Sequence, residues 1–260
     1  MKVSIVTVTF NCRQTIQDTI TSVADQDYPF IEHIVIDGAS TDGTRDIIEQ
    51  NGSKIRHFIS EPDSGIYNAM NKGIKLATGS IVGILNGDDI FYDKACVSAV
   101  VEEFKKKKVE AVYGNLVYVS PENLNAIVRY YNSEGFTPKM FAYGHMPAHP
   151  AFFVNRDCYE KYGFFKEDYA IASDFELLLR FLGTHKISHS CLPKVLVKMR
   201  TGGVSTRDFK SNWILNKEVV RACRENNVNT NMIKVFSKYI FKVFQLVNRP
   251  HKRRPVFGKV

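Results

Sequence analysis

The sequence predicts an α/β fold in which a mostly parallel sheet is flanked by helices. Three observations support this class. Over the first 120 residues, segments rich in β-branched residues alternate with stretches that carry apolar residues at helical spacing. The apolar segments are nearly continuous, which is typical of parallel strands buried on both faces. The chain has 260 residues, of which 44% are hydrophobic, so it can bury the core that such a sheet needs.

The predicted elements follow one another in a regular order. Strands are expected at 3–10, 33–37, 55–60 and 80–85. Helices are expected around 16–23, 47–48, 67–74 and 97–104, where apolar residues recur at helical spacing. Beyond residue 120 the alternation breaks down, although 173–183 is typical of a helix and 194–199 of a strand. We therefore expect one domain with a specialised second half.

The net charge of +8 is concentrated at the C-terminal end. Glu225 is the last acidic residue and eight basic residues follow it, so residues 1–225 hold as many basic as acidic side chains. A neutral body argues against nucleic-acid binding and favours a local partner for the tail. No run of about 18 apolar residues is present. The five cysteines are scattered without CxxC spacing, so we expect reduced thiols in a cytoplasmic protein.

Polar residues follow each predicted strand. Ligands of open α/β sheets bind beyond the carboxyl ends of the strands, which makes these residues the first candidates for a site. They are Thr9, Asn11, Asp37, Asp42, Asp63, Asn86, Gly87, Asp88 and Asp89. Any one of them can be turn chemistry, and Asp42 before Gly43 has the form of a helix cap. Neither GxGxxG nor GxxxxGK[ST] is present, which disfavours a dinucleotide site.

The adjacent acids Asp88 and Asp89 predict a divalent metal site. A crevice rich in carboxylates binds a phosphate ligand only if a cation lies between them. Hard oxygen ligands suit Mg²⁺ or Mn²⁺, which bind carboxylates and substrate phosphates together. The competing interpretation is a pair of solvated turn acids that cap a helix beginning near Asp93.

Several segments resemble the family 2 glycosyltransferases, whose GT-A fold is Rossmann-like. The first half carries VSIVTVTFN, VIDGASTDGT, SEPDSGIYNAMNKGIKLATG and ILNGDD, in the order and spacing of the donor-binding half of that family. The second half carries HPAFF, ASDFELLLRF and GGVST, similar to the transferases that build bacterial surface polysaccharides, such as the colanic-acid type. The resemblance implies a GT-A domain over 1–210. Its nucleotide-sugar-binding half would be 1–120 and its acceptor and catalytic half 121–210, with a helical basic tail over 211–260.

The resemblance also assigns roles. It implies a nucleotide-diphosphate sugar as donor, with a UDP-sugar as the leading choice, and a glycan or polyprenyl-linked acceptor. NGDD stands where the family has a DxD motif, so Asp89 is expected to hold the metal and Asp88 to contact ribose, next to Asn86 and Gly87. The other contacts that it implies are Thr9, Asn11 and Asp37 at the nucleoside, Asp63 near the base and Lys72 at the phosphates. The alternative for Lys72 is a solvated surface lysine.

With the resemblance, Asp174 in ASDFELL is the candidate general base. Transfer to a hydroxyl requires stabilisation of the departing diphosphate, which a metal supplies, and removal of a proton, which a carboxylate supplies. A single displacement with one base inverts the anomeric configuration. The alternative for Asp174 is a helix N-cap, and the two roles are compatible. We expect His149 to line the cleft, unless it is simply packed, and Arg200 beside the glycines 202–203 to contact the diphosphate.

Two other function classes stay open. A nucleotidyltransferase would normally show a glycine- and lysine-rich start after the first strand, which TFNCRQT lacks. A non-catalytic protein that binds sugar nucleotides would not require both Asp89 and Asp174.

The tail is a candidate membrane contact. Residues 232–247, MIKVFSKYIFKVFQLV, predict an amphipathic helix in which Lys234, Lys238 and Lys242 form one stripe. HKRRP follows, and anionic lipid attracts each basic residue near the surface by about 1 kcal/mol. We expect docking on the inner face of the cell membrane. Packing of the helix on the domain and a homodimer contact are the alternatives.

Overall fold

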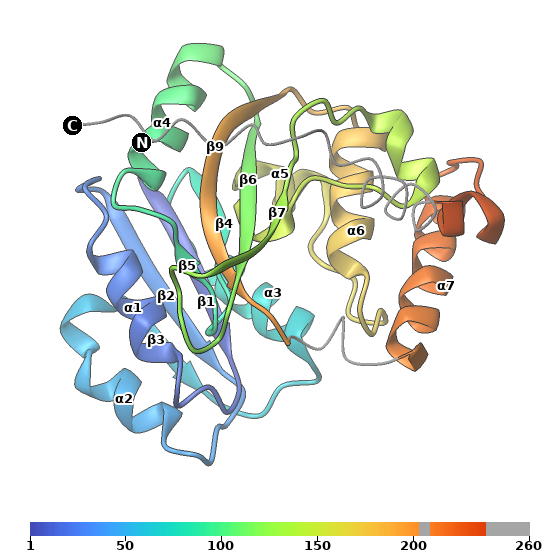
Figure 1. Cartoon of the computed structure of the whole chain (residues 1–260). Helices are drawn as coiled ribbons and strands as arrows, with labels where there is room; N and C mark the ends of the chain where they lie inside the picture. The colour runs from blue at the N-terminus through green and yellow to red at the C-terminus, as the bar shows by residue number, and fades with distance from the viewer. Residues whose placement is uncertain (203–208, 238–260) are drawn as a thin grey trace.

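The computed structural model describes residues 1–202 and 209–237, which build helices around one nine-stranded sheet (Figure 1). The strands are β1 (Val3–Thr9), β2 (Ile31–Asp37), β3 (His57–Ser60), β4 (Ile81–Ile84), β5 (Ile90–Phe91), β6 (Ala111–Val119), β7 (Ile127–Tyr131), β8 (Phe152–Asn155) and β9 (His189–Arg200). The α-helices are α1 (Ile16–Ala24), α2 (Thr44–Gln50), α3 (Ile66–Leu76), α4 (Cys96–Lys107), α5 (Asp157–Tyr162), α6 (Ser173–Leu178) and α7 (Phe209–Glu225). Short helical segments are η1 (Gly52–Lys54), η2 (Pro138–Tyr143), η3 (His149–Ala151) and the π-helical η4 (Leu179–Thr184), which continues α6.

The strand order is β3-β2-β1-β4-β8-β6-β9-β5, and β7 pairs with β6 outside this path. β3, β2, β1 and β4 run parallel to one another, as predicted for the first half. β8 runs antiparallel to both β4 and β6, whereas β9 is parallel to β6. The predicted α/β fold is therefore confirmed, and the parallel sheet turns into a mixed one in the second half.

Helices cover both faces of the sheet. Alternate residues of β1 face opposite sides, because side chains along a strand alternate. Val6 and Val8 pack in the larger core cluster with α3, α5, α6 and α7, and Val3 and Ile5 pack in a second cluster with α4. A third, small cluster joins α1 and α2 to β2. Figure 1 shows the result, with α1 and α2 at one end of the molecule and α6 and α7 at the other.

Helix α7 lies in the stretch that the sequence assigned to the tail, yet it packs in the larger core cluster. Val219, Val220, Ala222 and Cys223 are at most 5% exposed. The chain is helical again over 232–237, where Val235 is fully buried against the same cluster. The folded body therefore extends past residue 210.

The rest of the predicted tail helix, from residue 238 onward, lies outside the described residues. Within 1–202 and 209–237, no helix has the length and apolar character that a bilayer span needs.

Candidate active site

The polar residues predicted to form a site do meet at one edge of the sheet. The parallel register pairs Thr9 with Asp37 and Asp37 with Ser60. The backbone N–H of Gly87 donates to the carbonyl of Val8 over 2.9 Å, so the turn after β4 lies level with the end of β1. The carboxyl ends of β3, β2, β1 and β4 therefore form a continuous polar edge, the usual place for a ligand in such a sheet.

The turns after β1 and β2 are joined by hydrogen bonds. The N–H of Asn11 donates to Ser40 Oγ over 2.8 Å, and the N–H of Thr41 donates to Asn11 Oδ1 over 3.0 Å. Asn11 and Ala39 both have positive φ, 52° and 61°. The left-handed conformation costs a residue such as Ala about 1–2 kcal/mol, and such strain is often found at functional sites. Asp37 is fully buried and accepts from Ser40 N over 3.0 Å.

Asp42 is occupied by local structure. Its Oδ2 accepts the backbone N–H of Arg13 over 3.0 Å, and its Oδ1 accepts the N–H of Thr44 over 3.0 Å. The carboxylate thus ties the β1–α1 loop to the first turn of α2. The N-cap residue of α2 is Gly43, so Asp42 bonds the first turn from one position earlier, and both of its oxygens are engaged by local structure.

The loop between β3 and α3 brings Asp63 to the same edge. Its Oδ2 would lie 2.7 Å from a Cβ added at Gly38, so the Asp63 side chain reaches the turn after β2. Its Oδ1 accepts the N–H of Gly65 over 2.9 Å. Lys72 pairs with Glu61 over 2.7 Å. The charge of Lys72 is therefore already engaged in holding this loop.

Phe10 is an aromatic residue at this edge that the sequence analysis did not select. Its ring is 61% exposed, and its Cδ2 lies 3.4 Å from a Cβ added at Gly38. A large exposed ring beside buried Asp37 provides an apolar surface on which a flat ligand can stack. The signal in the sequence is a single aromatic residue directly after a buried strand, which is too common to stand out.

The turn after β4 buries one of its two acids completely. Asp89 is 0% exposed, and its Oδ2 accepts Asn86 Nδ2 over 3.1 Å. Burial, and then the neighbouring charge of Asp88, raise the pKa of Asp89 well above its usual value. The N-cap residue of α4 is Ala95, without a side-chain cap hydrogen bond, and Asp93 Oδ1 accepts the N–H of Ala95 over 2.9 Å. The alternative of two solvated acids that cap α4 is therefore wrong.

Three buried oxygens at this turn have no hydrogen-bond partner among the described residues: Asp89 Oδ1, Asn86 Oδ1 and Thr9 Oγ1. Gly87 permits this arrangement, because a Cβ there would lie 2.6 Å from Thr9 Oγ1. Buried oxygens without partners are rare and call for a ligand. Hard oxygen donors of this kind fit Mg²⁺ or Mn²⁺.

Within the described parts of the chain, no three His, Cys, Asp or Glu side chains gather closely enough to hold a metal alone. A cation at this turn would therefore need further ligands, such as substrate phosphates, as is usual for Mg²⁺.

Arg200, at the end of β9, holds the turn that contains Asp88 and Asp89. The pairing of β5 with β9 places Ile90 opposite Lys198, so Arg200 lies level with Asp88. Its guanidinium donates to the carbonyl oxygen of Asp88 and pairs with Asp18 of α1 over 2.5 Å. Arg200 is only 6% exposed. Its visible role is thus to fix the backbone of the acidic turn.

Asp174 lies in the first turn of α6, after the N-cap residue Ala172. The carboxylate is half-buried, and its Oδ1 accepts the N–H of Phe175 over 2.7 Å. Burial raises the pKa of Asp174 to about 6, an effect that the nearby Glu218 charge reinforces. A carboxyl with a pKa close to neutrality is suited to accept a proton in catalysis.

Helix α3 holds the segment that leads into α6 and Asp174. The Tyr67 hydroxyl, in the first turn of α3, donates to the carbonyl of Ile171. Asn71 donates to the carbonyl of Phe165 over 2.9 Å and accepts its N–H over 3.0 Å. Both residues belong to the EPDSGIYNAMNKG motif. Part of this motif therefore holds the loop between α5 and α6, which leads to the candidate base, a role that its sequence does not reveal.

His149 is packed beneath this loop. It is 8% exposed and its ring meets Phe165 edge-on, with the ring centroids 5.7 Å apart. Burial lowers the pKa of His149 to about 4. The imidazole is therefore neutral near pH 7 and cannot supply positive charge to a diphosphate.

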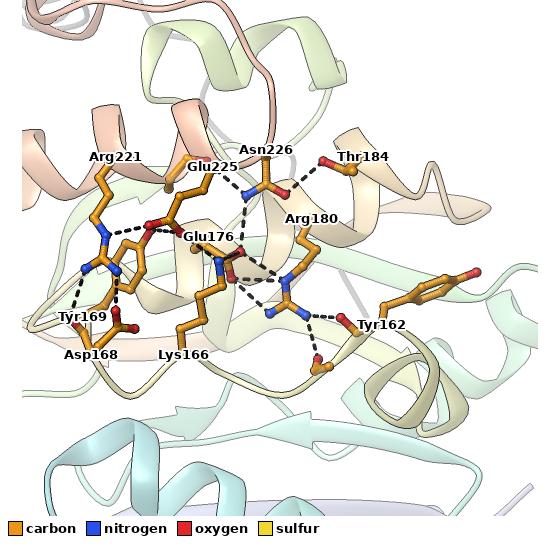
Figure 2. Close-up of polar contacts among 12 residues, drawn as sticks. Tyr162, Lys166, Asp168, Tyr169, Glu176, Arg180, Thr184, Arg221, Glu225 and Asn226 are labelled. Carbon is orange, nitrogen blue, oxygen red and sulfur yellow. Dashed lines mark hydrogen bonds and ion pairs between the residues drawn. The ribbon is translucent and has the colours of Figure 1, made fainter.

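A network of charged side chains between α6 and α7 stabilises the loop that joins α5 to α6 (Figure 2). Its centre is Glu176, which is 0% exposed and pairs with Arg180 and Lys166, each over 3.0 Å. Arg180 also donates to the carbonyls of three consecutive loop residues, 162–164. From α7, Glu225 pairs with Lys166 over 2.7 Å. A buried charge needs such compensation, so the network fixes α6 against α7.

A surface hollow of about 390 Å³ lies away from this edge, lined by Met1, Lys2, Pro29, Phe30 and Ile31. These residues surround the beginnings of β1 and β2 rather than their ends. The hollow lacks the convergent polar groups of the strand ends, which makes it the weaker candidate.

Comparison with known proteins gives a consistent result. The family model "Glycosyl transferase family 2" matches residues 4–163. The chain is 33% identical over 181 residues to an uncharacterized glycosyltransferase of Mycobacterium tuberculosis, covering 68% of each protein. It is 32% identical over 143 residues to the UDP-Glc:alpha-D-GlcNAc-diphosphoundecaprenol beta-1,3-glucosyltransferase WfaP of Escherichia coli, covering 50% of this chain and 57% of WfaP.

Solved structures share the fold. S. aureus TarS 1–349 in complex with UDP-GlcNAc superposes with a TM-score of 0.64 at 16% identity, covering 94% of this chain and 73% of that one. The mannosyltransferase PcManGT from Pyrobaculum calidifontis, in complex with GDP-Man and Mn²⁺, gives a TM-score of 0.61 at 16% identity, covering 94% and 80%.

Proposed function

The chain belongs to glycosyltransferase family 2, and we propose that it is an inverting, metal-dependent enzyme that moves a sugar from a UDP-sugar to a hydroxyl of a lipid-linked glycan. The observation that carries this proposal is a pair of carboxylates with different environments. Asp89 is buried with one oxygen unpartnered within the described structure, and Asp174 has a pKa of about 6. The first is suited to hold a cation and the second to accept a proton.

On the donor side, the strand-end residues would hold the nucleotide. The exposed Phe10 ring offers a stacking surface for the base, and Asp37 and Asp63 flank it with carboxylates. Asp89, with Asp88 beside it, would hold Mg²⁺ or Mn²⁺ against the diphosphate. When bound, the metal supplies Lewis-acid stabilisation of the charge that develops on the departing diphosphate.

On the acceptor side, Asp174 would take the proton of the attacking hydroxyl. Its raised pKa makes it a stronger base than an ordinary carboxylate while leaving it ionised at pH 7. The new glycosidic bond forms on the face of the sugar opposite the diphosphate, so the configuration at the anomeric carbon inverts. An α-linked donor would then give a β-linked product.

The likeness to WfaP supports the proposed substrate class. WfaP acts on a sugar linked to diphosphoundecaprenol and makes a β-1,3 bond from UDP-Glc, as its name states. We infer a similar polyprenyl-diphosphate acceptor here, and a place in surface-polysaccharide synthesis.

Thermal unfolding in the presence of nucleotide sugars tests the proposal. A ligand that binds only the native state raises its stability, by about 2.7 kcal/mol at a concentration 100-fold above Kd. We expect UDP-Glc or UDP-GlcNAc to raise Tm in Mn²⁺ and to have little effect in EDTA. GDP-Man serves as the control donor. Equal protection by UDP-sugars with and without metal would contradict the proposed metal dependence. Absence of protection by any nucleotide sugar would contradict the proposed donor class as a whole.

We further propose that the basic tail docks on an anionic membrane. The sequence places seven basic residues after Ser237, and the likeness to WfaP suggests an acceptor that resides in lipid. Because Val235 is buried in the body, the test should change charge and not length.

We expect the full chain with Arg249, Lys252, Arg253 and Arg254 changed to Gln to lose most binding to vesicles that contain phosphatidylglycerol, since each base contributes about 1 kcal/mol. Cosedimentation measures this, with neutral vesicles as the control. Undiminished binding would show that these four residues do not bind the membrane. A change in molecular mass in solution would indicate a dimer contact instead.

A further inference from the structure

Three consecutive backbone N–H groups just before α6 point at one carboxylate from α7. The N–H of Ala170 donates to Glu218 over 2.7 Å, to Oε1. The N–H groups of Ile171 and Ala172 both donate to Oε2, each over 2.9 Å. Hydrogen bonds to an ionised acceptor are about twice as strong as neutral ones. Glu218 therefore fixes the backbone of the turn 170–172 through three strong contacts.

The same turn is held from the opposite side. The carbonyl of Ile171 accepts the Tyr67 hydroxyl of α3, while its N–H donates to Glu218 of α7. The peptide groups on both sides of Ile171 are thus fixed by two different helices. Asp174 lies three residues after Ile171, so the orientation of this turn determines the direction in which the Asp174 carboxylate points.

We propose that Glu218 is a positioning residue for Asp174, which aims the candidate base by fixing the turn 170–172. This inference rests on the function proposed above. It gives α7 a part in the reaction, although no residue of α7 needs to touch a substrate.

The electrostatic surroundings of Asp174 support the same role. The titratable groups of other elements that interact electrostatically with Asp174 are Tyr67 on α3, Tyr131 on β7 and Glu218 on α7. Burial is the main cause of the raised pKa of Asp174, and the negative charge of Glu218 adds to it. Removing that charge would make Asp174 a weaker base as well as a less well oriented one.

The test replaces Glu218 by Gln in the full chain. Gln keeps the length of the side chain and one oxygen for Ile171 and Ala172, but turns an amide NH₂ toward the N–H of Ala170. We expect faster hydrogen exchange at the amides of 170–172, and kcat lower by roughly 10- to 100-fold, as small misplacements of a catalytic group can cause. The donor KM should stay within about twofold, because mutations that act only on the reacting step leave ground-state binding intact.

The pH profile separates positioning from general stability. Loss of the Glu218 charge lowers the pKa of Asp174, so the acid limb of kcat should move to lower pH in Glu218→Gln. The matched control is Glu225→Gln on the same helix, which breaks contacts to Lys166 and Tyr169 of the same loop but none to 170–172. We expect this control to leave both the amide exchange at 170–172 and the acid limb unchanged.

Several outcomes would overturn the inference. These are unchanged amide exchange and unchanged kcat in Glu218→Gln, or equal losses of kcat in both variants with no movement of the acid limb. If Glu218→Gln does not fold, Glu218→Asp keeps the charge and shortens the reach, and should speed exchange without moving the limb. Failure of the wild-type protein to transfer sugar would contradict the proposed function instead. The effect of Glu218 on the turn 170–172 and on the pKa of Asp174 can still be measured then, by amide exchange and by a ¹³C titration of the Asp174 carboxyl.

Discussion

Asp174→Asn is expected to lower turnover by roughly 10²- to 10⁴-fold, the usual contribution of a general base. Asn keeps the size of the side chain and an oxygen that can accept the N–H of Phe175, now 2.7 Å away. It cannot accept a proton. Donor affinity should therefore persist while kcat falls, which UDP release in the presence of a polyprenyl-diphosphate acceptor would measure.

The pH dependence provides a second sign of the same role. The folded protein raises the pKa of Asp174 to about 6, so the base is lost by protonation as pH falls through this value. Wild-type kcat should fall about tenfold per unit below pH 6, and this limb should be absent in Asp174→Asn. Asp168→Asn is the matched control, since Asp168 lies in the loop just before α6 with its side chain 63% exposed. Weakened donor binding with unchanged turnover in Asp174→Asn would contradict the assignment.

Asp89→Ala is expected to abolish metal-dependent donor binding and to lower turnover by roughly 10²- to 10³-fold or more, because the metal contributes several kcal/mol and each 1.36 kcal/mol is a factor of ten. The fold should survive. Asp89 Oδ1 has no hydrogen-bond partner in the described structure, so the change removes only the contact with Asn86, worth about 1 kcal/mol.

Asp89→Asn is the matched variant, since it keeps the shape and the contact with Asn86 but removes the charge. It should fail like Asp89→Ala. Asp88→Asn should retain part of the activity, because Asp88 is expected to support the nucleotide rather than to hold the metal alone. Full turnover of either Asp89 variant in EDTA would remove Asp89 from the metal site.

The first half of the fold could be predicted because its signals are local. Continuous apolar strands and amphipathic helices alternate there, and the polar residues at the strand ends meet because parallel strands place their carboxyl ends at one edge. β6 and β8 were not predicted, although β6 lies in the middle of the sheet. Their pairing joins segments about 40 residues apart, and no periodicity in the sequence marks that contact.

The contacts that hold the site residues in place could not be predicted either, because they too join segments that are far apart in the sequence. Nothing near Glu218 in the sequence indicates that its carboxylate would meet three N–H groups some 46 residues earlier. Arg200 was expected at the diphosphate because it is a charge beside two glycines in the sequence, yet its guanidinium is engaged by Asp18 and the backbone of Asp88. Residue type predicts that a group can bind a ligand, whereas its tertiary partners decide whether its charge is available.

The central claim is that two carboxylates have separate roles, Asp89 holding the metal with the donor and Asp174 accepting the proton. Calorimetric titration of wild type, Asp89→Asn and Asp174→Asn with the same UDP-sugar, in Mn²⁺ and in EDTA, tests it most directly. We expect wild type and Asp174→Asn to bind with similar affinity in Mn²⁺ and weakly in EDTA, and Asp89→Asn to bind weakly in both. Equal, metal-independent binding by all three proteins would contradict the claim.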